Sequence, residues 1–151
     1  MLNASAAKEL VLTRVFNAPR ALVFKAWTDP ESAKHWWGPT HHPAVFITMD
    51  VRVGGTWEGK LRGEADGKIL THRGVFLAVD PPKTLSFTFA WDEEGERGIE
   101  NVVTLTFEDL DGKTKMTLRQ SPFQSTTEQE GHGEGWSSTC DRLELHLSQH
   151  A

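Results

Sequence analysis

One stretch of the chain decides its fold: Thr84–Trp91, with the sequence TLSFTFAW. Large apolar side chains occupy every second position from Leu85 to Trp91, and small or polar residues stand between them. Side chains of a β-strand point alternately to its two faces, so this pattern predicts a strand with one aromatic, buried face and one solvent-exposed face. A strand of this kind needs a second layer of structure to cover its aromatic face.

Weaker alternation of the same kind extends outward on both sides. It predicts further strands at Lys8–Phe16, Val45–Arg52, Thr56–Leu61, Ile69–Val79, Val103–Phe107 and Lys113–Gln120. Short turn sequences, such as Gly54-Gly55 and Asp111-Gly112, separate consecutive strands and are typical of hairpins. The charged segment Asp92–Gly98 is predicted to be an exposed loop. Strands joined by such short connections indicate an antiparallel sheet.

Helix signals follow the first strand. Pro19 precedes a segment of helical spacing at Arg20–Trp27, and Pro30 starts a second one that is expected to end near Trp36. The sequence Trp-Trp-Gly-Pro at 36–39 then stops the helix, because neither Gly nor Pro continues it well. Two short helices are therefore predicted between the first two strands.

The last segment predicts a long amphipathic helix. Ser125 and Glu128 have the spacing of a capping box. One apolar stripe, about 100° wide at 100° per residue, excludes Arg142. It contains His132, Trp136, Thr139, Cys140, Leu143 and Leu147. The glycines at 131, 133 and 135 each cost about 1 kcal/mol relative to Ala in a helix interior. We therefore expect the helix to begin closer to Trp136.

This order of elements predicts an α+β, helix-grip fold formed by a single domain, residues 1–151. A curved antiparallel sheet wraps around the long C-terminal helix, with the two short helices after the first strand. The C-terminal helix is the element available to cover the aromatic strand face. Because a curved sheet and a straight helix rarely fill the space between them, a cavity is expected there.

Composition and charge exclude several classes of function. Hydrophobic residues make up 38% and charged residues 25% of the chain, which is ordinary for a globular protein. The net charge of −5 argues against a nucleic-acid partner, since a phosphate backbone requires a basic face. No apolar run is long enough to span a membrane, and the N-terminal segment does not have the pattern of a signal peptide. With one cysteine, Cys140, a reducing cytoplasm is the expected compartment.

Several motifs, in order, resemble those of a known family. They are RVF at 14–16, VFKAWTDP at 23–30, WWGP at 36–39, DVRVGG at 50–55, GVF at 74–76 and GW at 135–136. Over Glu9 to Leu147 the chain is similar to the activator-of-heat-shock-protein-90-ATPase-homologue family of the START-like, or SRPBCC, superfamily. The resemblance implies a helix-grip domain, in a superfamily that binds lipids, sterols, hormones or polyketides under the long helix. Some members catalyse cyclisation or aromatisation there, and the family's namesake is a co-chaperone.

The predicted cavity is aromatic. Six tryptophans and no tyrosine indicate a site that grips a planar or apolar ligand, with indole N–H groups as orienting donors. The alternative is that these side chains fill the core, which is favoured for Trp27. In the predicted site, the floor is formed by Phe87, Phe89 and Trp91, and one wall by Val103 and Leu105. The roof is formed by Trp136, Cys140 and Leu143, and His132 provides the polar contact. The remaining predicted cavity residues are Trp36, Trp37, Trp57 and Phe76.

No residue is predicted to be catalytic or to bind a metal or a cofactor. The seven histidines include no HExxH arrangement that would favour zinc. No spacing pairs the available acids and bases for catalysis. These residues are Asp50, Arg52, Glu58, His72, Glu100 and Arg119. Asp50 and Arg52 predict a structural ion pair near Gly54-Gly55. Cys140 is expected to be a core residue with a raised pKa.

Three hypotheses for function remain open. The first is a protein that binds a small apolar or amphipathic molecule between the sheet and the C-terminal helix. The second is a stress-related interaction module similar to the co-chaperone domain, with a chaperone as partner, binding through the acidic segment 92–100 and the WWGP segment. The third is a cyclase- or hydrolase-like enzyme that uses His132 or Asp50 as acid or base. Either a monomer or a homodimer is compatible with each of them.

Overall fold

The computed structural model describes residues 9–93 and 96–150 of the chain. Its elements are β1 (Leu10–Phe16), α2 (Arg20–Thr28), α3 (Pro30–Trp36), β2 (Ala44–Met49), β3 (Thr56–Arg62), β4 (Ile69–Asp80), β5 (Thr84–Glu93), β6 (Glu96–Arg97), β7 (Asn101–Leu110), β8 (Lys113–Ser121) and α4 (Thr126–His150). The α+β class, the two short helices after the first strand and the long C-terminal helix are confirmed.

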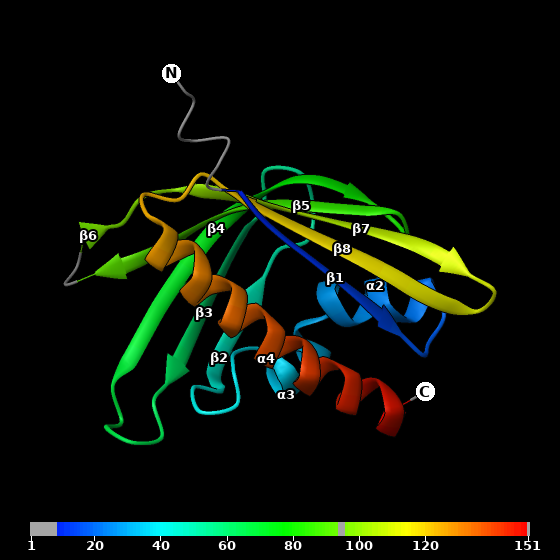
Figure 1. Cartoon of the computed structure of the whole chain (residues 1–151), viewed down its shortest axis with the longest axis horizontal. Helices are drawn as coiled ribbons and strands as arrows, with labels where there is room; N and C mark the ends of the chain where they lie inside the picture. The colour runs from blue at the N-terminus through cyan, green and yellow to red at the C-terminus, as the bar shows by residue number, and fades with distance from the viewer. Residues whose placement is uncertain (1–8, 94–95, 151) are drawn as a thin grey trace.

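The strands form one curved antiparallel sheet in the order β1-β8-β7-β5-β4-β3-β2, with β6 paired to β5. Figure 1 shows α4 running across the inner side of this sheet, with α2 and α3 near the C-terminal half of α4. The rings of His35 in α3 and His146 in α4 stack with centroids 5.8 Å apart, which places α3 against that half. The helix-grip architecture is therefore confirmed.

The core lies between the inner face of the sheet and the three helices. Trp27 of α2 is 1% exposed and packs against the rings of Trp36, Trp37 and Trp136, with centroids 4.8, 5.8 and 5.9 Å away. Edge-to-face and tilted contacts of this kind are the favoured arrangements of aromatic pairs. Trp27 is thus a core residue, as its helical stripe predicts.

The pairing of β4 with β5 is irregular near Gly74, where the two strands approach each other closely. The pairing register shifts between Phe76 and Ala78, and a Cβ at Gly74 would overlap the carbonyl group of Thr88 in β5. Two side-chain hydrogen bonds form at this point: Val75 N donates to Thr88 Oγ1 at 2.8 Å, and Trp57 Nε1 donates to Thr88 O at 3.1 Å. Glycine at 74 allows the two backbones to approach closely.

The predicted start of the C-terminal helix near Trp136 was wrong, because α4 begins at Thr126. The capping box is present: Ser125 Oγ accepts from Glu128 N at 3.1 Å, and Glu128 Oε1 accepts from Gln124 N at 3.1 Å. Gln129 Nε2 also donates to Glu9 O at 2.9 Å. These capping and tertiary contacts offset the low helix propensity of the glycines.

Two other boundaries differ from the prediction. Asp92–Gly98 is not simply a loop, since Asp92 pairs with Arg97 in a short hairpin; residues 94–95 lie outside the described part. The Asp92 carboxylate is held 3.3 Å from Arg73 Nε, so its charge does not oppose strand formation. β2 ends at Met49 because the chain turns at Asp50–Gly55, where Arg52 Nε and Asp50 Oδ2 form the predicted ion pair at 2.8 Å.

Candidate functional site

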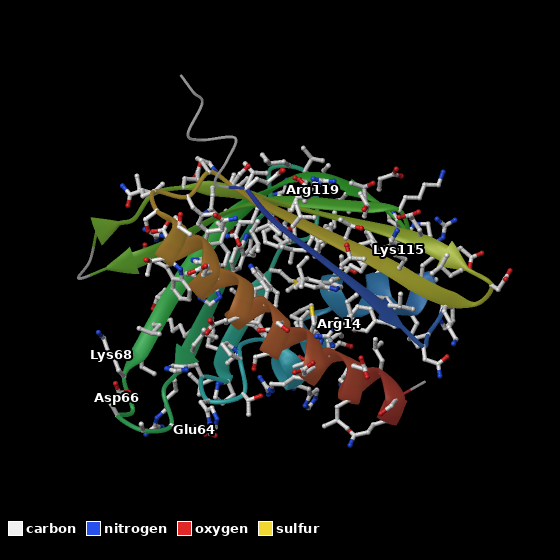
Figure 2. All side chains as sticks on the ribbon, in the orientation of Figure 1. Arg14, Glu64, Asp66, Lys68, Lys115 and Arg119 are labelled. Atoms are coloured by element: carbon white, nitrogen blue, oxygen red, sulfur yellow. The ribbon has the colours of Figure 1, made fainter. Side chains whose placement is uncertain are left out.

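A cavity of about 220 Å³ lies between the N-terminal half of α4 and the sheet. It is lined by Trp37, Gly38, Pro39, His42, Leu61, Leu70, His72, Phe89, Trp91, Gly131, His132, Gly135, Trp136 and Thr139. Gly131 is exposed, and Pro39 and His42 are half-buried, so the cavity opens to solvent between α4 and the segment 38–42. Beside this opening His41 Nδ1 lies 3.0 Å from Glu64 Oε1; Figure 2 labels Glu64 in the turn between β3 and β4.

Two indole–imidazole hydrogen bonds form part of the cavity wall. Trp37 Nε1 donates to His72 Nε2 at 2.8 Å, and Trp91 Nε1 donates to His132 Nε2 at 3.1 Å. An indole nitrogen is only a donor, so Nε2 must be the acceptor in both imidazoles. Whenever these rings are neutral, their proton is therefore on Nδ1.

Both imidazoles are neutral at pH 7. Burial lowers the pKa of His72 from 6.5 to about 3, and the positive charge of a protonated His132 lowers it further. Burial also lowers the pKa of His132, although the Glu128 carboxylate acts in the opposite direction. The cavity wall thus carries two uncharged histidines, which suits an apolar or neutral occupant.

The polar atoms of two further wall side chains, Trp136 and Thr139, are hydrogen-bonded within the protein. Trp136 Nε1 donates to Gln120 Oε1 at 2.8 Å, and Gln120 Nε2 donates to Asn101 Oδ1 at 2.8 Å. Thr139 Oγ1 donates to Gly135 O at 2.8 Å. These hydrogen bonds leave the aromatic rings as the main surface that the cavity offers.

Arg142 of α4 holds the segment that forms one side of the opening. Its guanidinium donates to the carbonyl oxygens of Trp37 at 2.9 Å, Gly38 at 2.8 Å and His35 at 3.1 Å. Gly38 has φ +92°, a conformation that favours glycine. Ser138 Oγ, one turn earlier in α4, accepts from Thr40 N at 2.9 Å. Two residues of α4 therefore fix the position of the WWGP segment.

Comparison with known families assigns the chain. The family model described as Activator of Hsp90 ATPase homolog 1-like protein (AHSA1) matches residues 17–148. The chain belongs to the AHSA1 family. The resemblance carried by the sequence motifs is therefore confirmed.

Solved structures are similar to this AHSA1 chain over nearly its whole length. A protein from Chromobacterium violaceum has a TM-score of 0.85 at 22% identity, covering 93% of this chain and 97% of its own. An AHSA1 protein from Silicibacter pomeroyi has a TM-score of 0.84 at 24% identity, covering 95% and 99%. A protein from Mycobacterium smegmatis has a TM-score of 0.80 at 26% identity, covering 95% and 92%. Among curated proteins, none is significantly similar in sequence.

The structure of this AHSA1 chain divides the thirteen predicted site residues into two groups. Five line the cavity: Trp37, Phe89, Trp91, His132 and Trp136. The other eight are buried in the packed core and do not line it: Trp36, Trp57, Phe76, Phe87, Val103, Leu105, Cys140 and Leu143. The void next to Trp57, Phe76 and Phe87 measures about 10 Å³, the space of about one water molecule. Ligand contact by these eight residues stays a prediction.

Several lining residues were not predicted. His72 lies at every second position with Leu70 and Phe76 along β4, so strand alternation could have placed it on the inner face. Its position in the wall depends on pairing with Gly59 on one side and Trp91 on the other, which alternation alone does not show. Nothing in the sequence signals that Arg142 reaches three backbone carbonyls.

Metal binding and thiol chemistry find no support in the described residues. Within 9–93 and 96–150, no group of three or more His, Cys, Asp or Glu side chains could hold a metal ion. Burial raises the pKa of the Cys140 thiol to about 12, so it is a core residue, not a nucleophile. No helix in the described part is long and apolar enough to cross a membrane.

Replacing Arg142 with methionine should lower the free energy of unfolding by about 2–4 kcal/mol. Hydrogen bonds from a charged donor contribute roughly 1.5–3 kcal/mol each, and the three backbone carbonyls would lose their donor. Urea denaturation followed by tryptophan fluorescence measures this change. Gln149→Met, at an exposed position of the same helix, is the control and should change stability by less than about 0.5 kcal/mol. An equal effect of both substitutions would contradict the role assigned to Arg142.

Proposed function

We propose that this AHSA1 protein binds a small apolar or amphipathic molecule in the cavity between α4 and the sheet. The observation that carries the proposal is the cavity of about 220 Å³ with the rings of Trp37, Phe89, Trp91 and Trp136 in its wall. An apolar cavity of about 150 Å³ accommodates benzene, so the present one has room for a molecule of one or two rings. The opening beside His42 leaves a polar end of the molecule in contact with solvent.

Two glycines of α4 support this proposal. A Cβ at Gly131 or Gly135 would meet no atom within 4 Å, so packing does not require glycine at either position. Both residues line the cavity, and each costs about 1 kcal/mol of helix stability relative to Ala. Gly133 differs, because its Cβ would lie 3.3 Å from Leu10 Cδ1. Glycine at 131 and 135 therefore lowers helix stability but leaves cavity volume free for a bound molecule.

Native mass spectrometry of the protein purified from its own host tests the proposal. We expect an additional mass that is lost on denaturation and is absent from the Gly135→Leu variant, whose side chain occupies the cavity. Glu134→Leu places the same side chain on the exposed side of the same helical turn and should retain the mass. The spectra also distinguish a monomer from a homodimer.

The same pair of variants gives a second, independent readout. Indane, an apolar molecule of two fused rings, should quench tryptophan fluorescence saturably in the parent and in Glu134→Leu, and not in Gly135→Leu. Trp37, Trp91 and Trp136 line the cavity, so binding there changes the surroundings of three fluorophores. No additional mass together with no saturable quenching would overturn the proposed function.

The cytoplasm is the compartment that we propose. The single cysteine, Cys140, is free and buried, which agrees with a reducing environment. A small molecule remains the proposed partner in preference to a chaperone, since the cavity is the feature of the described residues that points to an occupant.

A further inference from the structure

We propose that the bound molecule carries a hydrogen-bond acceptor, such as a carbonyl oxygen, and that the Nδ1–H of His132 binds it. This inference rests on the proposed function and names the chemical class of the ligand. His132 becomes the residue that selects among apolar molecules of similar size.

The position of His132 sets up this contact. The residue lies in the second turn of α4, lines the cavity and is half-buried among the rings of Phe89, Trp91 and Phe123, whose centroids are 5.6, 6.0 and 5.0 Å away. Rings on three sides restrict the orientation of the imidazole. The hydrogen bond from Trp91 Nε1 restricts the imidazole further, because it holds Nε2 against the indole of a residue in β5.

That hydrogen bond also decides which chemistry His132 offers to a ligand. With Nε2 accepting from Trp91, the neutral ring carries its proton on Nδ1, which is then a donor. Among the described residues, Nδ1 of His132 has no hydrogen-bond partner, and it is not closed off from solvent as Nδ1 of His72 is. An acceptor on the ligand can therefore take this hydrogen bond without displacing a protein partner of Nδ1.

His72 does not offer the same contact, although it has the same tautomer. It is 2% exposed and is enclosed by the rings of Trp37, Trp57, Phe89 and Trp91, with centroids 6.0, 5.4, 5.2 and 4.7 Å away. Its Nδ1 is buried without a partner among the described residues. Of the two histidines bonded to indoles, His132 is the one that a ligand can reach.

The rest of the lining favours a neutral acceptor over a charged group. No carboxylate, lysine or arginine is among the lining residues, so the wall offers no negative side chain to a cation and no lysine or arginine to an anion. Burial of an unpaired charge is strongly unfavourable. Glu128 of the same helix acts electrostatically on His132, but it is not among the lining residues.

Two probes with the same ring skeleton test the inference: 1-indanone, which has a carbonyl acceptor, and indane, which has none. In the His132→Phe variant we expect the affinity for 1-indanone to fall roughly tenfold, the effect of losing one hydrogen bond. The affinity for indane should stay within about twofold of the parent value, because phenylalanine preserves the apolar contact. Isothermal titration calorimetry measures both affinities.

A conservative variant and a spectroscopic measurement separate this role from a structural one. In His132→Gln the amide oxygen replaces the acceptor of Trp91 and the amide N–H replaces the donor to the ligand, so 1-indanone binding should be restored. In the parent, 1-indanone should shift the ¹⁵N resonance of His132 Nδ1, and indane should not. Circular dichroism shows whether each variant is folded.

The outcomes are distinct. An equal loss of both probes in His132→Phe, or no response of the Nδ1 resonance to 1-indanone, overturns the hydrogen bond while the proposed function stands. Failure of both probes to bind the parent contradicts the proposed function and the inference with it. Selective loss of 1-indanone, restored by glutamine, supports the assignment.

Discussion

Acidification from pH 6.5 to about pH 3 should destabilise the protein by roughly 3–5 kcal/mol through His72 alone. In the unfolded chain this imidazole takes up a proton near its ordinary pKa of 6.5, whereas in the folded protein burial lowers its pKa to about 3. Between these values only the unfolded state holds the proton, so each pH unit lowers the free energy of unfolding by about 1.4 kcal/mol. Above pH 6.5 the contribution is present in full.

Urea denaturation at several pH values between 7.5 and 3.5 measures this loss. In His72→Gln the amide oxygen can still accept from Trp37 Nε1, and the side chain does not titrate, so the slope of stability against pH should decrease by about 1.4 kcal/mol per unit. Gln149→Met, at an exposed position with no titratable group, is the control and should keep the parent slope. An unchanged slope in His72→Gln would show that another group dominates the acid sensitivity.

Gly74→Ala should destabilise the protein by about 3 kcal/mol or more, since overpacking that displaces backbone exceeds the usual cost of an added methyl group. The new Cβ would overlap the carbonyl group of Thr88 and lie 2.7 Å from Trp57 Nε1. β5 would have to move away from β4, and the two hydrogen bonds to Thr88 would be lost with it. The three atoms nearest to the new Cβ belong to the Thr88 backbone and the Trp57 indole, so none is the end of a flexible side chain that could move aside.

The matched control is Gly131→Ala, because a Cβ there meets no atom within 4 Å. This substitution should raise the free energy of unfolding by about 1 kcal/mol through helix propensity. Urea denaturation of both variants measures the contrast. If both alanine substitutions changed stability in the same direction, the close approach at Gly74 would not be the feature that shapes the sheet.

Alternation along the strands could predict the fold and the inner face, and it did so for Phe87, Phe89 and Trp91 alike. Its prediction of a solvent-exposed opposite face was wrong for β5, because Ser86, Thr88 and Ala90 are buried as well. It could not predict that Phe89 and Trp91 line the cavity while Phe87 packs into the core. That difference depends on the close approach of the two strands at Gly74 and on the register shift after it. Both result from contacts between strands, whereas alternation describes one strand at a time.

The same limit applies to α4. Hydrophobic periodicity found the residues that pack, such as Cys140 and Leu143, because an apolar stripe reports burial. The α4 side of the cavity includes Thr139, at the edge of that stripe, and Gly131 and Gly135, which lie outside it. The start of the helix was mispredicted for a related reason, since glycine propensity is local and the contacts that offset it are not.

Because positions 131 and 135 face open space, the residue chosen there affects the fit of a ligand and the packing of the core separately. An added Cβ at either position meets no atom within 4 Å, so under the proposed function a substitution there changes which molecules fit while the core keeps its packing. Specificity then diverges one substitution at a time, with no compensating mutation elsewhere. On this proposal, relatives with nearly the same backbone need not bind the same molecules.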